Sequence, residues 1–390
     1  MKRSLFRPGL LLGLGALALG AAESASAQDL VVEGGVVVIQ SSKRATRQGR
    51  LVIRQGKVKA AGAASKVKRP KGVQVLRFPG GYVVPGFVDA SAGLGLVGGR
   101  DERTSIMAPD VTVSSRIDPK HRDFAHARAA GITTCLVTPG WANLLGGRAA
   151  LVKTTGALVA LKRPILKLAL GSYVLQRNRV PTSRAGVLAL LRETLRKHHG
   201  KRDGGVLSAF ARGELRAVVS LGGASDLRAL LGLSDRYGLP LVLAPTFKVG
   251  KRALASLAAA GQSLSGRTVL LGPWTGAQRR DTFKTAALLS KAGARVAFVS
   301  ESPDVPASGL RQTVALAIQG GLSPRKALAG ITETPAAALG IEHRVGSLLP
   351  GRDADFVVFD GPPLRLSSRV LAVYVGGRRV YARPAPKAKD

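Results

Sequence analysis

The sequence has one cysteine and few aromatic residues, and both shortages limit what the protein can be. Cys135 has no second cysteine with which to form an internal disulfide. Aromatic residues make up 4% of the chain, and its most basic part offers only Phe78 and Tyr82 for stacking against bases. We therefore expect a protein without internal disulfides and without a specific nucleic-acid partner.

Long hydrophobic runs are also missing. The apolar segment 9–22 is shorter than the ~20 residues that a membrane-spanning helix needs. It follows Lys2, Arg3 and Arg7 and precedes the small residues "ASA" at 25–27, which together are typical of a cleaved secretory signal. The sequence thus predicts a signal peptide at 1–27 and an exported protein, periplasmic or secreted, without a transmembrane anchor.

Acidic residues are absent between Gly34 and Val88, in a chain whose formal net charge is +36. The same segment holds twelve bases, namely Lys43, Arg44, Arg47, Arg50, Arg54, Lys57, Lys59, Lys66, Lys68, Arg69, Lys71 and Arg77. Such a single-sign field is either a solvated basic face or an attachment surface for an anionic partner. The second interpretation predicts that region 43–77 binds an anionic envelope polymer.

The spacing of apolar residues changes along the chain. Short alternating runs with Gly turns at 30–40, 49–62 and 73–78 predict strands of a small sheet. From residue 82, apolar runs separated by helical stretches predict parallel strands with crossover helices. The eight predicted strands are 82–88, 132–137, 149–153, 164–170, 216–221, 239–244, 268–272 and 295–299. The third is the weakest, because no clear helix separates it from the fourth.

These patterns predict an α/β fold with two parts. A (β/α)₈ TIM-like barrel is expected at 82–342, and a small composite β-sandwich domain at 28–81 and 343–384. The charged end, 385–390, is expected to be disordered.

Four stretches point to a family. They are "GKVKAAG" at 56–62, "GGYVVPGFVDAS" at 80–91, "ARAAGITTCLVTPGWANLLGG" at 127–147 and "ITETPAAALGIEHRVGSLLPGRDADFVVFDGPPL" at 331–364. In these stretches the chain resembles the amidohydrolase superfamily, and most closely its imidazolonepropionase-like branch. The resemblance implies descent from hydrolases of C–N bonds other than peptide bonds, which use zinc or another divalent metal at the barrel mouth.

The metal ligands that the resemblance implies are almost all replaced. Ser91 and Gly93 stand where the first strand would supply two histidines, and Ser220 and Ala244 lie at the ends of the fifth and sixth strands. A neutral hydroxyl binds zinc weakly beside imidazole, thiolate or carboxylate. Only Glu301, where the family has an aspartate after the eighth strand, keeps a carboxylate. We therefore expect no metal cofactor.

No other sequence pattern supplies a substitute site. The five histidines are not spaced to converge on a single point, and each is expected at the surface or capping a helix: His121, His126, His198, His199 and His343. Lys167 resembles a bridging carbamylated lysine but has no histidine beside it. "GLGLVG" at 93–98 matches a dinucleotide pattern without the helix that must follow. A serine nucleophile is disfavoured because no G-x-S-x-G elbow and no histidine base are present.

Both tryptophans follow predicted barrel strands at the active face of such barrels. Trp141 and Trp274 could plug the space left by the histidines or form a stacking platform for a small ligand. The plug is the favoured interpretation. The barrel-mouth candidates for chemistry are Asp89, Ser91 and Glu301. The sequence thus predicts an exported, catalytically inactive binding or structural protein; the alternative is an active hydrolase of non-peptide C–N bonds with an unconventional site.

Overall fold

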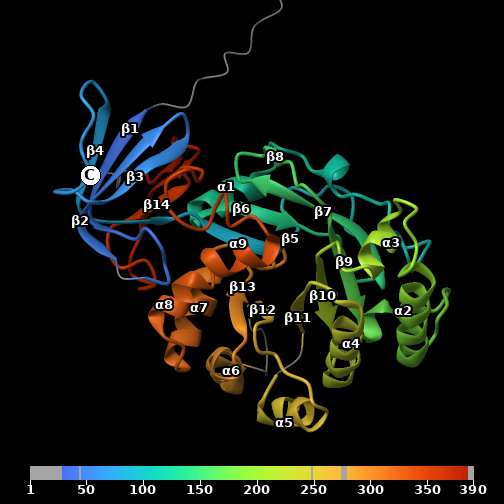
Figure 1. The fold of residues 1–390 in the computed structure, drawn as a ribbon. Helices are drawn as coiled ribbons and strands as arrows, with labels where there is room; N and C mark the ends of the chain where they lie inside the picture. The colour runs from blue at the N-terminus through green and yellow to red at the C-terminus, as the bar shows by residue number, and fades with distance from the viewer. Residues whose placement is uncertain (1–28, 44, 247–248, 274–278, 385–390) are drawn as a thin grey trace, which may run out of the picture.

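The computed structural model describes residues 29–43, 45–246, 249–273 and 279–384 (Figure 1). The predicted signal peptide, Arg44, Trp274 and the C-terminal tail lie outside the described residues. Within the described part, no helix is both long and apolar enough to cross a bilayer.

The two ends of the chain share one seven-stranded sheet. Its strands, in spatial order, are β16 (Arg378–Ala382), β15 (Val370–Val375), β14 (Phe356–Phe359), β4 (Gln74–Pro85), β1 (Leu30–Val37), β2 (Thr46–Arg54) and β3 (Lys57–Ala63). Figure 1 shows the blue N-terminal strands beside the red β14 at one end of the molecule. Because β14 pairs antiparallel with β4, the two ends of the chain form one extra β domain.

The second sheet forms a nearly closed barrel. Its eight main strands, in spatial order, are β13 (Arg295–Phe298), β12 (Thr268–Leu271), β11 (Leu241–Pro245), β10 (Ala217–Leu221), β9 (Ile165–Leu170), β7 (Leu145–Lys153), β6 (Ile132–Val137) and β5 (Phe87–Ala92). The short β8 (Leu158–Val159) pairs only with β7. Between β13 and β5, the segment after α8 completes the wall, since Phe298 N–H donates to Gly330 O (2.8 Å) and Val88 N–H to Ile331 O (2.9 Å).

Three details differ from the sequence prediction. Residues 82–85 of the predicted first barrel strand belong to β4 and pair with β1 and β14, so the barrel begins at Phe87. The third strand, β7, runs antiparallel to both neighbours because no crossover helix precedes or follows it. The strands of the extra domain hydrogen-bond in one sheet, whereas a sandwich was predicted. The proposed domain boundaries at 81/82 and 342/343 stay predictions.

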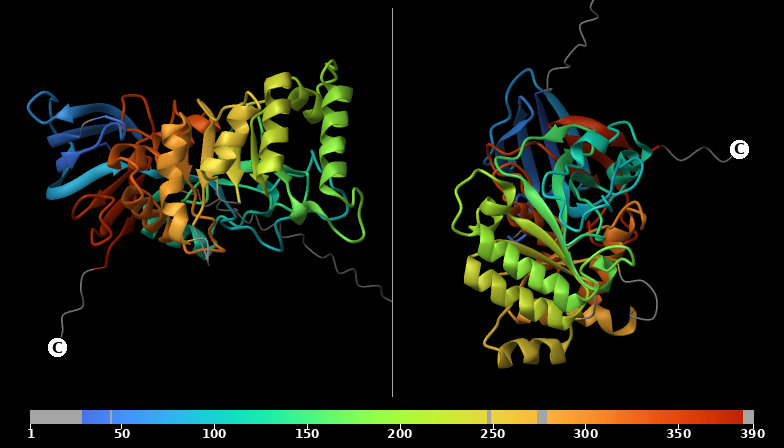
Figure 2. Two further views of the ribbon diagram at one scale, coloured as in Figure 1. Left: turned by 90° about the horizontal axis from the view of Figure 1, so that it is seen from below. Right: turned by 90° about the vertical axis from the view of Figure 1, so that its right-hand side faces the viewer.

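Helices cover the outside of the parallel strands. They are α1 (Arg122–Ala129), α2 (Arg184–His198), α3 (Val206–Ala211), α4 (Ala224–Tyr237), α5 (Lys251–Ala259), α6 (Arg279–Lys291), α7 (Gly309–Gln319) and α8 (Pro324–Ala329), with short 3₁₀ turns at Ser114–Arg116 and Ser172–Val174. The last helix, α9 (Glu333–Leu339), packs its apolar side chains against the residues inside the barrel. Figure 2 shows the green-to-orange helices standing side by side along the barrel.

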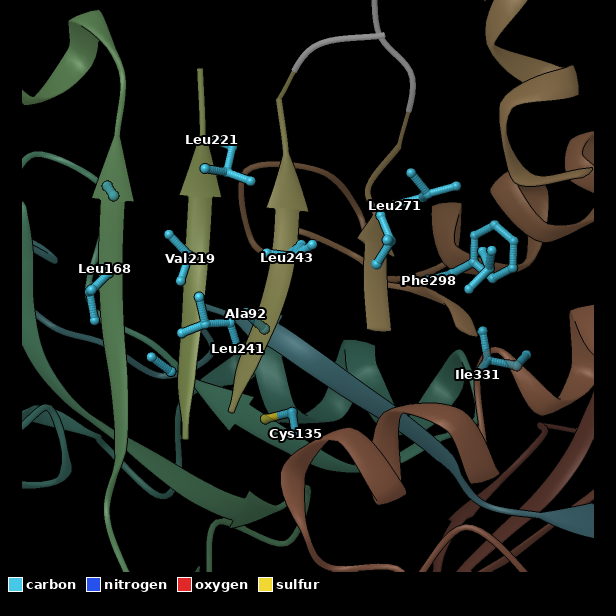
Figure 3. Close-up of a cluster of buried hydrophobic side chains, with 14 of the residues drawn as sticks. Ala92, Cys135, Leu168, Val219, Leu221, Leu241, Leu243, Leu271, Phe298 and Ile331 are labelled. Carbon is cyan, nitrogen blue, oxygen red and sulfur yellow. The ribbon is translucent and has the colours of Figure 1, made fainter. Parts of the chain in front are cut away.

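The strand period of two divides the core into two layers. One set of side chains, including Leu168, Val219 and Leu243, packs in the cluster that contains the covering helices (Figure 3). Their alternate neighbours, including Ile165, Val218 and Val242, form the separate cluster inside the barrel. Successive side chains of a strand point to opposite faces. On each strand, the residue two positions after a member of this inner cluster therefore also faces the interior.

Candidate functional site

A cavity of about 190 Å³ opens at the carboxyl ends of the barrel strands. Of the residues predicted for the mouth, Ser91, Glu301 and Trp141 line it and Asp89 does not. The other residues that line it are Arg100, Asp101, Thr138, Pro139, Gly140, Lys167, Ser220, Ala244, Pro245, Thr246, Leu270, Gly272, Val299 and Asp304. The lining mixes apolar residues with a few polar and charged side chains, as is usual for a ligand pocket.

The alternation of side chains along the strands brings a lysine and a serine together on the inner face of the barrel. Lys167 follows Ile165 by two residues on β9, and Ser220 follows Val218 by two on the adjacent β10. Both residues are buried: 4% of the surface of Lys167 and 3% of the surface of Ser220 are exposed. Lys167 Nζ donates to Ser220 Oγ at 2.6 Å. The barrel therefore presents an ammonium and a hydroxyl, in contact, to the cavity.

The surroundings of Lys167 lower its pKa. Burial and, to a smaller extent, the nearby Arg100 cation lower the pKa of this lysine to about 8, against the opposing effects of Glu301 and Asp101. Its alkyl stem extends from a strand whose six residues are all buried. Lys167 is thus an amine that is partly deprotonated near neutral pH.

A second cation fills the space beside Gly93. A Cβ atom added to Gly93 would lie 2.7 Å from Cζ and 2.8 Å from Nε of Arg100. Arg100 Nη1 is held by Asp304 Oδ2 at 2.7 Å, and Gly140 N–H donates to the carbonyl of Arg100 at 3.0 Å. The guanidinium therefore lies where a side chain at position 93 would begin, and a histidine there would require Arg100 to move.

Glu301 stands opposite the two cations. It has a left-handed backbone, with φ of 54°, in the loop directly after β13. Burial raises the pKa of its carboxyl group, while Lys167 and Arg100 act in the opposite direction. The side chain lies against Gly272, because a Cβ there would collide with the Glu301 carboxylate. The mouth thus combines three acids, Asp101, Glu301 and Asp304, with two bases, Arg100 and Lys167.

Asp89 lies beneath the mouth, and its carboxylate is hydrogen-bonded to residues of the barrel wall. Its Oδ2 accepts from Ser300 N–H at 3.2 Å and from the Ser300 hydroxyl, and its Oδ1 accepts from Ser91 N–H at 3.3 Å. Burial raises the pKa of this carboxyl to about 6, despite those three hydrogen bonds. The side chain is fully buried. Its position suits a structural link between β5 and the segment after β13 better than contact with a ligand.

Trp141 lies at the cavity rim with 47% of its surface exposed. Its ring packs against Tyr173, with centroids 5.9 Å apart. A plug would be buried, so this exposure does not fit the plug interpretation for Trp141. Trp274 lies outside the described residues, and its role stays a prediction.

The donor set at the mouth does not fit a divalent metal. The aligned positions offer hydroxyls, an alanine methyl, a glycine and the single carboxylate of Glu301, and two cations, Arg100 and Lys167, approach the same space and would repel a third. Elsewhere, His121 caps α1, His198 contacts Ser208 and His199 contacts Ala211 O. Among the described residues, no group of three or more His, Cys, Asp or Glu side chains could hold a metal ion.

Sequence reasoning missed two features of this site. The serine nucleophile was weighed only with histidine as its base, although the period of two in "ILKLAL" and "AVVSL" already aligned Lys167 with Ser220 on one face. Arg100 left no comparable signal. It enters from the irregular loop after β5, whose path depends on long-range contacts with Asp304 and Gly140.

Comparison with known proteins identifies the wider family. Residues 267–380 match the amidohydrolase family. The chain is 33% identical over 92 residues to amidohydrolase tasK of Hapsidospora irregularis, covering 24% of this chain and 9% of that protein. It is 50% identical over 40 residues to the imidazolonepropionase of Hahella chejuensis (strain KCTC 2396), covering 10% of each. These matches span about a tenth of the length of either curated relative.

The structural likeness extends over nearly the whole chain. The crystal structure of an amidohydrolase from Thermotoga maritima MSB8 superposes with a TM-score of 0.77 at 25% identity, covering 91% of this chain and 100% of that one. The sequence match in the C-terminal segment and the structural likeness of the barrel and the extra β domain thus indicate the same family. The sequence matches and the structural likeness together support an assignment to the amidohydrolase superfamily.

Proposed function

We propose that positively charged side chains take the place of the family's metal centre in this protein, and that it binds a small polar ligand at the barrel mouth. The observation that carries this proposal is the Arg100 guanidinium beside Gly93, in the space a ligating side chain would need. Lys167 supplies a second positive charge in contact with Ser220. The exposed Trp141 offers a ring face at the rim. The N-terminal sequence further supports export to the periplasm or the exterior.

The rate enhancement available without a metal supports the loss of the hydrolytic activity of the family. A catalytic zinc lowers the pKa of its bound water from about 15.7 to about 7 and polarises the scissile carbonyl. A carboxylate such as Glu301, acting alone as a general base on water, contributes only ~10²- to 10⁴-fold. Enzymes accelerate their reactions by ~10⁶-fold or more. Metal-free water attack at this mouth therefore falls short of enzymatic hydrolysis of amides, lactams or cyclic ureas.

Purified protein is expected to contain no stoichiometric zinc, manganese or iron, and added metal should produce no hydrolysis of such substrates. Elemental analysis and a chelator-controlled turnover assay measure this. The double replacement Ser91→His and Gly93→His should also fail to restore turnover, because Arg100 occupies the space beside position 93 and Ser220 and Ala244 supply no ligand. A metal bound one-to-one with chelator-sensitive turnover in the unmodified protein would contradict the proposal.

The alternative function, a hydrolase with an unconventional site, keeps one observation in its favour, the contact between Lys167 and Ser220. It differs from the binding proposal in predicting a covalent intermediate or turnover. A ligand that is bound but not chemically converted supports the binding function.

The basic region is a second proposed binding surface. Of its exposed cations, three are paired: Arg54 with Asp29, Lys57 with Asp353 and Arg77 with Glu33. Seven others are exposed and have no ion pair within the described residues, namely Lys43, Arg47, Lys59, Lys66, Lys68, Arg69 and Lys71. We propose that these seven cations attract an anionic envelope polymer.

Binding to a polyanion such as dextran sulfate should weaken steeply as salt rises, because exposed charges are screened beyond ~10 Å at 0.1 M ionic strength and ~3 Å at 1 M. Glutamine at Lys66, Lys68, Arg69 and Lys71 together should weaken it further at low salt. Surface plasmon resonance at several salt concentrations measures both effects. The control replaces four exposed cations of the helical side, Arg192, Arg196, Lys197 and Lys201, with glutamine. An equal loss in both variants would show that net charge, rather than this region, governs binding.

A further inference from the structure

The contact between Lys167 and Ser220 differs from the other buried lysine pairing in the protein. Lys153, also buried, contacts the carboxylates of Asp353 (2.9 Å) and Asp355. These two acids raise the pKa of Lys153 even though burial opposes them. Lys167 donates its one identified hydrogen bond to a neutral hydroxyl, and its pKa is lowered. Lys153 is built to stay charged, whereas Lys167 is placed where it loses its proton more readily.

Position also separates this pair from an ordinary structural contact. Lys167 Nζ and Ser220 Oγ are 2.6 Å apart, within the range for a nucleophile and its base, and both residues line the cavity at the barrel mouth. The fold holds them on neighbouring parallel strands, where Lys167 pairs with Val218 and Ser220 lies two residues further along β10, opposite Ala169. Rigid strands keep such a pair aligned more accurately than loops do.

We propose that Ser220 is a nucleophile and Lys167 its general base, so that the protein accepts an acyl group from small activated acyl compounds. This activity goes beyond the ligand binding proposed above and does not depend on it. The pair needs no metal, which agrees with the replaced ligand set. Serine–lysine pairs are a known variant of the serine–histidine arrangement.

The proposed step needs only Lys167, Ser220 and the acyl compound. Neutral Lys167 Nζ takes the proton of Ser220 Oγ as that oxygen forms a bond to the acyl carbon. The bond from the acyl carbon to the leaving oxygen then breaks, and the leaving group departs with the electron pair. The proton on Lys167 passes to the departing oxygen or to solvent. The products are an ester on Ser220 and the free leaving group.

Arg100 supplies positive charge for the oxyanion of this step. Its guanidinium lies in the same cavity, and its charge acts on Lys167. Its Nε is buried and has no hydrogen-bond partner among the described residues. A donor that is already in place stabilises developing negative charge without reorganisation.

The test uses the full chain with p-nitrophenyl acetate and, separately, a fluorophosphonate, followed by intact mass and peptide mapping. Unmodified protein should gain one adduct, on Ser220, and Ser220→Ala should gain none there. Lys167→Met and Lys167→Arg should each slow labelling about 100-fold or more at pH 7, since methionine has no base and arginine stays protonated. The labelling rate of the unmodified protein should rise with pH through the range around 8, and both variants should lose this rise.

The protein contains a matched control pair. Lys326 Nζ donates to Ser290 Oγ at 2.8 Å on the surface, outside the cavity. Ser290→Ala should leave the labelling rate unchanged. Melting temperatures confirm that each variant is folded.

Each outcome decides the proposal. An ester on Ser220 that depends on Lys167 supports it. No adduct on Ser220, an amide on Lys167 instead, or labelling that Lys167→Arg leaves intact overturns it. None of these results bears on metal content, which is measured separately; an ester on Ser220 would favour the alternative, a hydrolase with an unconventional site, over a protein that only binds its ligand.

Discussion

Replacing Lys153 with methionine is expected to destabilise the fold by about 3 to 5 kcal/mol, because the change leaves buried carboxylates without their cation. Lys153 ends β7 of the barrel, and Asp353 and Asp355 precede β14 of the extra domain. The side chains of the three residues are 10%, 9% and 3% exposed. The network therefore joins the two parts of the protein through charge in a poorly solvated place. Urea denaturation at neutral pH measures the change.

The matched control for that variant is Lys57→Met. Lys57 contacts the same Asp353 at 2.5 Å, but its own side chain is 49% exposed. An exposed ion pair contributes ~0 to 1 kcal/mol, so this variant should change the free energy of unfolding by less than about 1 kcal/mol. Equal losses in the two variants, or a stable Lys153→Met protein, would show that burial does not govern the strength of this network.

Much of the fold follows from the sequence because local patterns and tertiary structure agree. Runs such as "AVVSL" and "LVLAP" are apolar and short, and the helices between them have clear amphipathic spacing. The direction of β7 was harder to predict, since a strand reads the same in either orientation. Only its connections reveal it, and the loops on both sides carry no helix that could return the chain for a parallel strand.

The site could be predicted only in part, for a related reason. The resemblance to the amidohydrolase superfamily implied that Ser91, Ser220, Ala244 and Glu301 lie at the mouth, after barrel strands, and all four line the cavity. Arg100 lies in an irregular loop, and no local rule relates its position to Gly93. Asp89 was predicted for the mouth because it lies in β5 near the strand end, but at that position its side chain reaches the backbone of Ser300 in place of the cavity.

The contribution of Asp89 to the stability of the protein should fall as pH rises from about 4 to 7, because its carboxyl group ionises. Burial raises the pKa of Asp89 in the folded protein to about 6, above its ordinary value of 3.8. The neutral acid is thus favoured by folding, and its contribution is full below about pH 4 and lost as pH rises through about 6. A shift of about 2 units corresponds to about 3 kcal/mol. The titration of other carboxyl groups overlaps this range, so the effect of Asp89 is isolated by comparison with Asp89→Asn.

Asparagine does not titrate, so the free energy of unfolding of Asp89→Asn relative to the unmodified protein should change by about 3 kcal/mol in favour of the variant between pH 4 and pH 7.5. Urea denaturation at these two pH values measures the difference, and the other carboxyl groups, common to both proteins, cancel. Ser300→Ala is the complementary variant. Its hydroxyl donates to the Asp89 carboxylate and opposes the rise in the pKa of that carboxyl. Without it, the loss of stability should extend to higher pH. Parallel pH profiles for the unmodified protein and Asp89→Asn would mean that Asp89 keeps its ordinary pKa and that burial is compensated in full by its hydrogen bonds.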